Sequence, residues 1–211
     1  FKTEKLVQYL SEDHRLEGNN DFGKDIIPRI YGTERVVAYD YVKHEGERAY
    51  WRDIGTVDAY WKANMELCSI EPELNLYNQS WPIWTYQVQL PPAKFVFDDE
   101  GRRGEAIDSL VSGGCIIAGA HVKRSVIFFA TRIETCSMVK DSVVLPGVYI
   151  GRNCRINRAI IDKGTRIPDG AIIGEDPAED ARRFHISDEG IVLVTPEMMG
   201  QNLMFGVIAI Y

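Results

Sequence analysis

The stretch AYWRDIGTVDAYW, residues 49–61, places two adjacent charged residues inside an aromatic run. A charged side chain that is buried without a partner is costly, so Arg52 and Asp53 need either each other or a bound ligand. Thr56 can cap a helix that begins directly after it, and the N-terminal end of a helix attracts anions such as phosphates. The residues by themselves favour a local Arg52–Asp53 ion pair; the alternative is the edge of a phosphate site.

A second charged motif, DFGKDIIP, occupies residues 21–28. Asp21 stands just before a short predicted helix, where its carboxylate can accept hydrogen bonds from backbone N–H groups as an N-cap. Lys24 can pair with Asp21 or with Asp25, and we assign Lys24 no catalytic role.

Composition limits the class of partner. The chain has 211 residues, of which 45% are hydrophobic and 26% are charged, the balance of a soluble globular protein with one large or two small domains. The net charge of −7 argues against nucleic acid as the main partner, although it leaves room for a local basic patch that binds small phosphates.

Cysteine usage and hydropathy limit the compartment. The four cysteines form no Cys-x-x-Cys pair, so we expect neither a zinc knuckle nor a disulfide framework, and we expect a reducing cytoplasm. No signal peptide opens the sequence. We expect no contact with membranes, because even the longest apolar run, residues 203–211, is too short to span a bilayer.

The segment 1–90 has the mixed pattern of an α/β domain. Apolar residues at helical spacing and a candidate N-cap at Thr3 predict a first helix. The alternation in residues 36–42 predicts a strand. A second helix is predicted to begin after Thr56 and to end at Pro72, since proline cannot continue a helix.

The two prolines of LPPAKF, residues 90–95, predict an extended linker that reaches to about residue 108. From Ser109 onward the sequence has a period of six, in which a small residue, any residue and an aliphatic residue recur. Nine units with two one-residue slips follow: Ser125-x-Ile127, Thr131-x-Ile133, Ser137-x-Val139, Val143-x-Leu145, Val148-x-Ile150, Cys154-x-Ile156, Ala159-x-Ile161, Thr165-x-Ile167 and Ala171-x-Ile173.

This period is too short for a pair of helices and is typical of short parallel strands, joined by tight turns and stacked as a β-helix. We predict that the aliphatic residues point inward. The basic residues of the repeat are predicted to point outward, where such charges usually form a solvated face: Arg152, Arg155, Arg158, Lys163 and Arg166.

A hexapeptide β-helix is a scaffold that does not specify one chemistry. Acyltransferases, sugar nucleotidyltransferases and plain oligomerisation modules all use it. His121 lies within the repeats, and acyltransferases of this architecture use a histidine base. A surface histidine is the favoured interpretation of His121.

The ordered set of motifs narrows the choice. Eight segments follow one another: DFGKDIIP, YWRDIGTVDAYWKAN, WPIWTY, LPPAKF, SLVSGGCII, DSVVLPGVYIG, IIDKGTRIPDGAIIG and DARRFHISDEGIVLVT. Together they closely resemble the C-terminal half of bacterial glucose-1-phosphate adenylyltransferase, over almost the whole chain to about Pro196. RDxGT alone is weak, because it occurs across the sugar-phosphate nucleotidyltransferases, but the whole set is specific.

This resemblance implies an α/β remnant of a nucleotidyltransferase domain, residues 1–90 with a linker to about 108, followed by a left-handed parallel β-helix, residues 109–211, with regulatory and oligomerisation roles. It implies transfer of an adenylyl group from ATP to glucose 1-phosphate with Mg²⁺, which releases pyrophosphate and supplies glycogen synthesis in the cytoplasm. Members of the family are typically homotetramers that respond to phosphorylated allosteric effectors.

The resemblance also implies roles for individual residues. Asp53 corresponds to a metal-binding aspartate of the RDxGT motif and is the expected catalytic residue. The other expected sites are substrate contacts at Asp21, Phe22, Trp51 and Arg52, and contacts with the effector's phosphate at Lys163, Arg182 and Arg183. The alternative to a substrate contact is packing in the core for Trp51, and the N-cap role alone for Asp21.

Three features of that family are missing from the sequence: the Gly-rich triphosphate loop, the second metal-binding aspartate and the EKP-like sugar-phosphate motif. A triphosphate needs a cradle of backbone N–H groups. We therefore expect a fragment that does not catalyse adenylyl transfer alone. The alternatives are a catalytically inert β-helix that oligomerises and binds an effector, and an acyltransferase that depends on His121 and coenzyme A.

Overall fold

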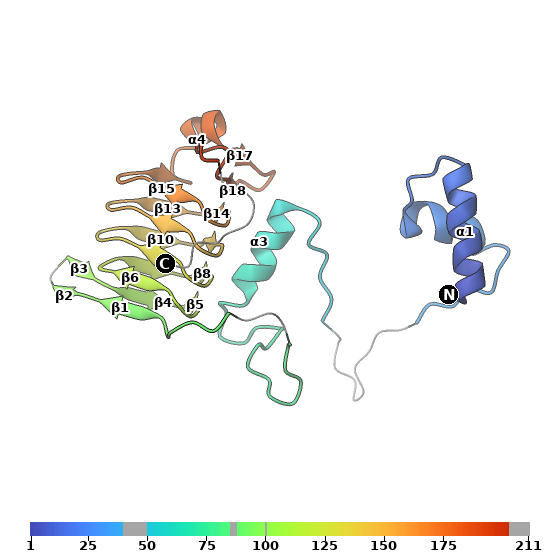
Figure 1. Ribbon diagram of the computed structural model, residues 1–211, viewed down its shortest axis with the longest axis horizontal. Helices are drawn as coiled ribbons and strands as arrows, with labels where there is room; N and C mark the ends of the chain where they lie inside the picture. Colours follow the sequence, from blue (N-terminus) through green and yellow to red (C-terminus); the bar gives the residue numbers. More distant parts are fainter. Residues whose placement is uncertain (40–49, 85–87, 100, 203–211) are drawn as a thin grey trace. The chain divides into compact units, whose positions relative to one another are not determined.

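The computed structural model describes residues 1–39, 50–84, 88–99 and 101–202. The chain divides into two units, Phe1–Ala49 and Tyr50–Tyr211 (Figure 1). The apolar run at residues 203–211 lies outside the described residues.

The first unit is a small helical cluster. Helix α1 (Thr3–Arg15) packs against a single π-helical segment, η1 (Phe22–Ile26), which continues into helix α2 (Ile27–Ile30). The apolar core of this unit consists of Tyr9, Ile26 and Ile30.

The first helix differs from its sequence prediction. Thr3 is not the N-cap, because the helix starts one residue earlier than expected, with Lys2 at the cap position and no side-chain hydrogen bond. The buried residues of α1 are Tyr9 and Asp13. Asp13 is only 1% exposed, and its ion pair with Arg29 of α2 offsets the cost of burying the charge.

The predicted strand at residues 36–42 is covered only in part. Residues 36–39 have no regular structure, and residues 40–42 lie outside the described residues.

In the second unit, helix α3 (Val57–Glu66) precedes the β-strands. The helix ends six positions before Pro72, so the prediction that proline ends it was wrong. Two short-range hydrogen bonds close its last turn. The N–H of Leu67 donates to the carbonyl of Asn64 at 3.1 Å, and the N–H of Cys68 donates to the carbonyl of Met65 at 3.0 Å. Such i to i−3 bonds are a common end of an α-helix.

The rest of the unit is a parallel β-helix with three sheets, which confirms that the repeats form a β-helix (Figure 1). The first sheet contains β1 (Lys94–Val96), β6 (Ile116–Ala118), β9 (Arg132–Ile133), β12 (Tyr149–Ile150) and β15 (Arg166–Ile167). The second contains β4 (Glu105–Ile107), β7 (His121–Lys123), β10 (Met138–Lys140), β13 (Arg155–Asn157) and β16 (Ile172–Ile173). The third contains β5 (Leu110–Val111), β8 (Val126–Ile127), β11 (Val143–Val144), β14 (Ala159–Ile161) and β18 (Val192–Val194).

The β-helix has an insertion near each end. A hairpin, β2 (Asp98–Asp99) and β3 (Arg102–Arg103), follows the first strand. Near the other end, helix α4 (Pro177–Arg183) leads into β17 (His185–Ile186), which pairs antiparallel with β18. Strand β1 pairs with β6, so the β-helix begins within the segment that the sequence suggested as a linker.

The core is a stack of inward aliphatic residues, as the period predicts, with one difference of register. The unit assigned to Val143-x-Leu145 instead turns Ser142 and Val144 inward, where Val144 is in register with Ile127 and Ile161. Val143 is also buried, but it belongs to a second apolar cluster on the outside of the sheet. The one-residue slip therefore falls one unit earlier than the sequence suggested.

One corner of the β-helix is built from residues with left-handed backbone. Asp108, Arg124, Asp141 and Arg158 occupy equivalent turns between the second and third sheets, with φ between 44° and 49°. This conformation is unfavourable for residues with a side chain. Hydrogen bonds between coils support it. The N–H of Arg124 donates to the carbonyl of Ile107 at 2.9 Å, and the N–H groups of Asp141 and Arg158 make the equivalent bonds at 3.1 and 3.2 Å.

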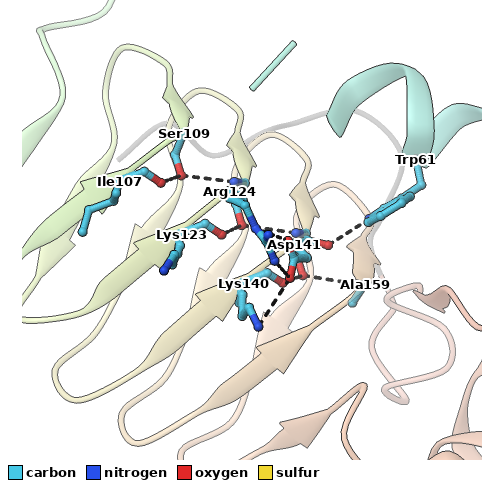
Figure 2. A network of polar contacts seen from close by, with 10 residues as sticks. Trp61, Ile107, Ser109, Lys123, Arg124, Lys140, Asp141 and Ala159 are labelled. Atoms are coloured by element: carbon cyan, nitrogen blue, oxygen red, sulfur yellow. Dashed lines mark hydrogen bonds and ion pairs between the residues drawn. The ribbon is translucent and has the colours of Figure 1, made fainter. Parts of the chain in front are cut away.

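Serine hydroxyls line the inside of this corner. The Oγ of Ser125 donates to the carbonyl of Lys123 at 2.8 Å and accepts the N–H of Ser142 at 3.2 Å. Ser142 repeats the pattern, since it donates to the carbonyl of Lys140 and accepts the N–H of Ala159 at 3.1 Å. Figure 2 shows this ladder from Ser109 to Ala159. The small residues of the repeat therefore satisfy backbone groups that would otherwise be buried without partners.

Two expectations from composition can be compared with the described residues. All four cysteines are free, so no disulfide is formed: Cys68, Cys115, Cys136 and Cys154. Within the described ranges, no helix is long and apolar enough to cross a membrane.

Candidate functional site

The Asp53 loop leads directly into helix α3. The Asp53 carboxylate is exposed, and its Oδ1 accepts the N–H of Gly55 at 3.0 Å. Thr56 caps the helix as predicted, since its Oγ1 accepts the N–H of Ala59 at 3.1 Å. An exposed carboxylate can bind a cation, and the helix N-terminus beside it attracts phosphates.

Arg52 does not pair with Asp53. Its Nη2 donates to Glu66 at 2.8 Å and to Glu73 at 2.7 Å, and its guanidinium lies 5.8 Å from the centre of the Tyr50 ring. The Glu66 carboxylate raises the pKa of Arg52, with a smaller contribution from Glu73. The hypothesis of a local Arg52–Asp53 ion pair was therefore wrong, and a substrate phosphate at Arg52 would compete with two carboxylates.

Trp51 is 73% exposed, so the alternative of core packing does not hold for it. The exposed ring is accessible to a sugar, and that contact stays a prediction.

Helix α3 is fixed to the outside of the β-helix. Its apolar residues pack against a cluster formed by Val143, Ile160 and Ile191. The Trp61 indole Nε1 donates a hydrogen bond to the carbonyl oxygen of Asp141 at 2.9 Å, which Figure 2 shows. This side of α3 consists of Val57, Tyr60, Trp61 and Met65. The position of the Asp53 loop therefore depends on the β-helix, which a local reading of the sequence could not reveal.

In the first unit, Asp21 is an N-cap as predicted. Its Oδ1 accepts the N–H groups of Gly23 at 2.7 Å and Lys24 at 2.9 Å. These bonds, from Lys24 first and then Gly23, lower the pKa of the Asp21 carboxyl. Phe22 is partly exposed, with its ring 5.7 Å from the Phe1 ring. Asp21 and Phe22 belong to a different unit from Asp53, so their substrate contacts stay predictions.

The candidate effector residues are all exposed. Lys163 lies in the turn between β14 and β15, and among the described residues its ammonium makes no ion pair. Arg182 pairs with Glu179 within α4, and the Arg183 guanidinium lies 4.7 Å from the centre of the Phe184 ring.

The structure brings together basic residues that the sequence did not group. A groove of about 540 Å³ along the first sheet is lined by Lys94, Arg102, Arg132 and Arg152. Arg132 pairs with Glu134 at 2.6 Å, while the side chains of Lys94 and Arg152 form no ion pair among the described residues. Strand register places Lys94 and Arg132 on either side of Ile116. Extending the repeat by one coil length into the segment before residue 109 could have shown from the sequence that these basic residues lie on one sheet.

Comparison with known proteins finds two family models, which match different parts of the chain. A family model described as "Nucleotidyl transferase" matches residues 1–70, and one described as "GlmU-like, C-terminal hexapeptide" matches residues 91–194. The chain is 63% identical over 204 residues to glucose-1-phosphate adenylyltransferase of Thiobacillus denitrificans, a match that covers 96% of this chain. By sequence, the chain belongs with the glucose-1-phosphate adenylyltransferases.

Further relatives carry the same name. The protein from Methylococcus capsulatus is 58% identical over 207 residues, or 97% of this chain, and that from Dechloromonas aromatica is 55% identical over 211 residues, or 98% of this chain. These matches cover 46%, 49% and 48% of the three relatives, so the chain spans about half the length of the adenylyltransferases that it matches.

Membership of this family gives the acyltransferase alternative no support. The Nδ1 of His121 lies 2.7 Å from Oε1 of Glu105, its neighbour on the adjacent strand. The histidine is therefore half of a cross-strand pair on the outer face of the second sheet.

The residues present fit a magnesium ion only in part. Among the described residues, no group of three or more His, Cys, Asp or Glu side chains could hold a metal ion. Mg²⁺ commonly keeps several waters and takes one or two carboxylates together with substrate phosphates. Asp53 can supply one such carboxylate to a site that other groups complete.

Proposed function

We propose that this chain contributes a metal-binding carboxylate and a β-helix to a glucose-1-phosphate adenylyltransferase. In this reaction a phosphate oxygen of glucose 1-phosphate attacks the α-phosphorus of ATP, ADP-glucose forms, and pyrophosphate leaves. The observation that carries the proposal is the exposed Asp53 carboxylate in an RDxGT loop, just before the capped N-terminus of α3. The product would supply glycogen synthesis.

Asp53 would hold Mg²⁺, which when bound neutralises charge on the phosphates. The chain's own contribution is positional. The Gly55 N–H fixes one oxygen of the Asp53 carboxylate. The Thr56 cap starts the helix, whose positive N-terminal end attracts the substrate phosphates. Arg52 would contact a phosphate if its two glutamates release it.

Asp21 and Phe22 would contact the glucose, with Asp21 accepting hydrogen bonds from sugar hydroxyl groups. Its Oδ1 is already an N-cap, so Oδ2 is the atom that we assign to the sugar. Trp51 would add an aromatic wall, which its exposure permits.

We further propose regulation by a phosphorylated effector at the exposed cations, with Lys163 as the main contact and Arg182 and Arg183 as additional ones. Lys163 is the favoured contact because its ammonium has no competing ion pair among the described residues. By analogy with the family, we also propose that the protein assembles as a homotetramer in the cytoplasm.

The test compares two proteins: the 211-residue chain, and a longer protein in which the chain is joined to a nucleotide-binding half. We expect pyrophosphate release that depends on both ATP and glucose 1-phosphate from the longer protein only. Absence of this activity from the longer protein would overturn the proposal and favour the catalytically inert, effector-binding β-helix. Activity of the 211-residue chain by itself would refute the need for the second half.

A further inference from the structure

The turn between β17 and β18, residues 187–190, contacts helix α3 directly. The hydroxyl of Ser187 donates a hydrogen bond to Oδ1 of Asp58, and Glu189 forms an ion pair with Lys62. The members of these pairs are 129 and 127 positions apart in the chain. The contacts are therefore tertiary, and they join the far end of the β-helix to the helix that follows the Asp53 loop.

Arg158 lies between the turn and the helix and adds a third contact. Its Nη2 donates to the carbonyl oxygen of Glu189 at 2.9 Å, and its guanidinium lies 5.3 Å from the centre of the Trp61 ring. Trp61 is also bonded to Asp141 at 2.9 Å. Helix α3 is thus held both by the turn and by the corner of the β-helix.

The turn has an ordered geometry of its own. The Oγ of Ser187 accepts the N–H of Ile191 at 2.9 Å, and the N–H of Gly190 donates to the carbonyl of Ser187 at 3.0 Å. Gly190 has φ of 80°, which residues with a side chain rarely adopt. Ile191 is 1% exposed and packs in the cluster beneath α3. A turn that is fixed in this way can hold a second element in place.

One of these contacts is at the start of α3, the end that follows Asp53 in the sequence, and the other is near the middle of the helix. Asp58 is in the first turn of the helix, and Lys62 follows on the same face, since residues four apart are neighbours on a helix. We propose that the turn 187–190, through Asp58 and Lys62, is a clamp that positions the Asp53 carboxylate for metal binding. Asp58, Lys62, Ser187 and Glu189 are positioning residues, and this assignment of their purpose rests on the proposed function of Asp53.

Hydrogen exchange of the 211-residue chain tests the clamp without any catalysis. Glu189→Gln removes the ion pair with Lys62 and keeps the carbonyl that Arg158 uses. We expect the amides of α3 to exchange about two- to five-fold faster, the size of effect that an exposed ion pair produces. The matched control is Glu175→Gln, which removes the 2.9 Å ion pair with Arg155 elsewhere on the β-helix and should leave α3 unchanged.

Unchanged exchange of α3 in Glu189→Gln, or equal acceleration in the control, would overturn the clamp. Ser187→Ala provides a second variant at the same turn, and we expect its largest effect on exchange at the first turn of α3, next to Asp58. Faster exchange spread evenly over the whole β-helix would indicate general destabilisation and would also count against the clamp.

A charge swap in the longer protein tests the positioning role. Lys62→Glu should raise the Mg²⁺ concentration for half-maximal rate several-fold, and the double variant Lys62→Glu with Glu189→Lys should restore it. A single variant with an unchanged Mg²⁺ requirement, or a double variant without recovery, would refute the role. If the unaltered longer protein has no adenylyl transfer activity, the proposed function fails, and the exchange experiment alone decides the clamp.

Discussion

The indole Nε1 of Trp61 donates a hydrogen bond to the main-chain carbonyl oxygen of Asp141, 2.9 Å away. The Asp141 side chain at the same time pairs with Arg124 at 2.7 Å and with Lys140 at 3.7 Å. Figure 2 shows these contacts meeting at one corner. A residue with strained, left-handed backbone is therefore held by its side chain, and its carbonyl group anchors the helix that follows the Asp53 loop.

Removing this hydrogen bond should destabilise the second unit. Trp61→Phe keeps an aromatic ring but removes the indole N–H, and we expect a loss of about 1 kcal/mol in the free energy of unfolding. Urea unfolding of the 211-residue chain measures this loss. Trp51→Phe is the control, because Trp51 is 73% exposed and should change the stability by less than about 0.5 kcal/mol. Equal effects of the two variants would contradict the anchoring role of Trp61.

A buried hydrogen bond of the serine ladder should contribute more to the free energy of unfolding than an exposed serine hydrogen bond. Ser142→Ala leaves the N–H of Ala159 without its acceptor inside the corner, at a cost of about 1–3 kcal/mol. The comparison is Ser69→Ala, an exposed residue three positions after the end of α3, where water can replace the hydrogen bond to the carbonyl of Glu66. Chemical denaturation of both variants decides the point, and a Ser142 variant as stable as the Ser69 variant would show that the ladder is dispensable.

The first unit should show an acid-dependent contribution from Asp21. The pKa of this carboxyl lies below its ordinary value of 3.8, because the N–H groups of Lys24 and Gly23 donate to it. A lowered pKa in the folded state means that the carboxylate stabilises the fold above pH 3.8 and that this contribution is lost as the pH falls through the lowered pKa. A carboxyl-carbon NMR titration should give a midpoint below 3.8, and a midpoint at or above that value would exclude the cap in solution.

The four cysteines should differ in reactivity in the native chain. Burial raises the pKa of the Cys115 and Cys154 thiols, which lowers the fraction of reactive thiolate, whereas Cys136 is exposed. Alkylation followed by mass spectrometry should modify Cys136 first and should reach the two buried cysteines only in urea. Early modification of Cys154 would mean that the coils open locally at that position.

Loss of the Asp53 charge should reduce turnover of the longer protein. Asp53→Asn keeps the size of the side chain but weakens metal binding, and we expect the rate at limiting Mg²⁺ to fall by about a hundredfold, since metal stabilisation of a phosphoryl transition state is worth several kcal/mol. Additional Mg²⁺ should recover part of this rate. Asp98→Asn, on the β2–β3 hairpin, is the control of equal charge change. An unchanged Mg²⁺ dependence in Asp53→Asn would remove the metal role.

The features that the sequence predicted correctly are those with a local or periodic cause. The six-residue period indicated a β-helix because each inward aliphatic residue recurs once per strand. Thr56 and Asp21 were identified as N-caps because a cap depends on residues only two or three positions away. The register error at Ser142 arose because Val143 is also apolar, and only α3, packed outside the sheet, explains why an outward residue is buried.

The sequence by itself therefore determined the β-helix, the N-caps at Asp21 and Thr56 and the family to which the chain belongs. The partners of the charged residues were decided by tertiary structure. Arg52 pairs with Glu66 and Glu73 instead of its neighbour Asp53, and Lys62 pairs with Glu189 at the far end of the β-helix. A long charged side chain reaches many groups that folding brings near it, so the nearest opposite charge in the sequence is a poor guide to its partner in space.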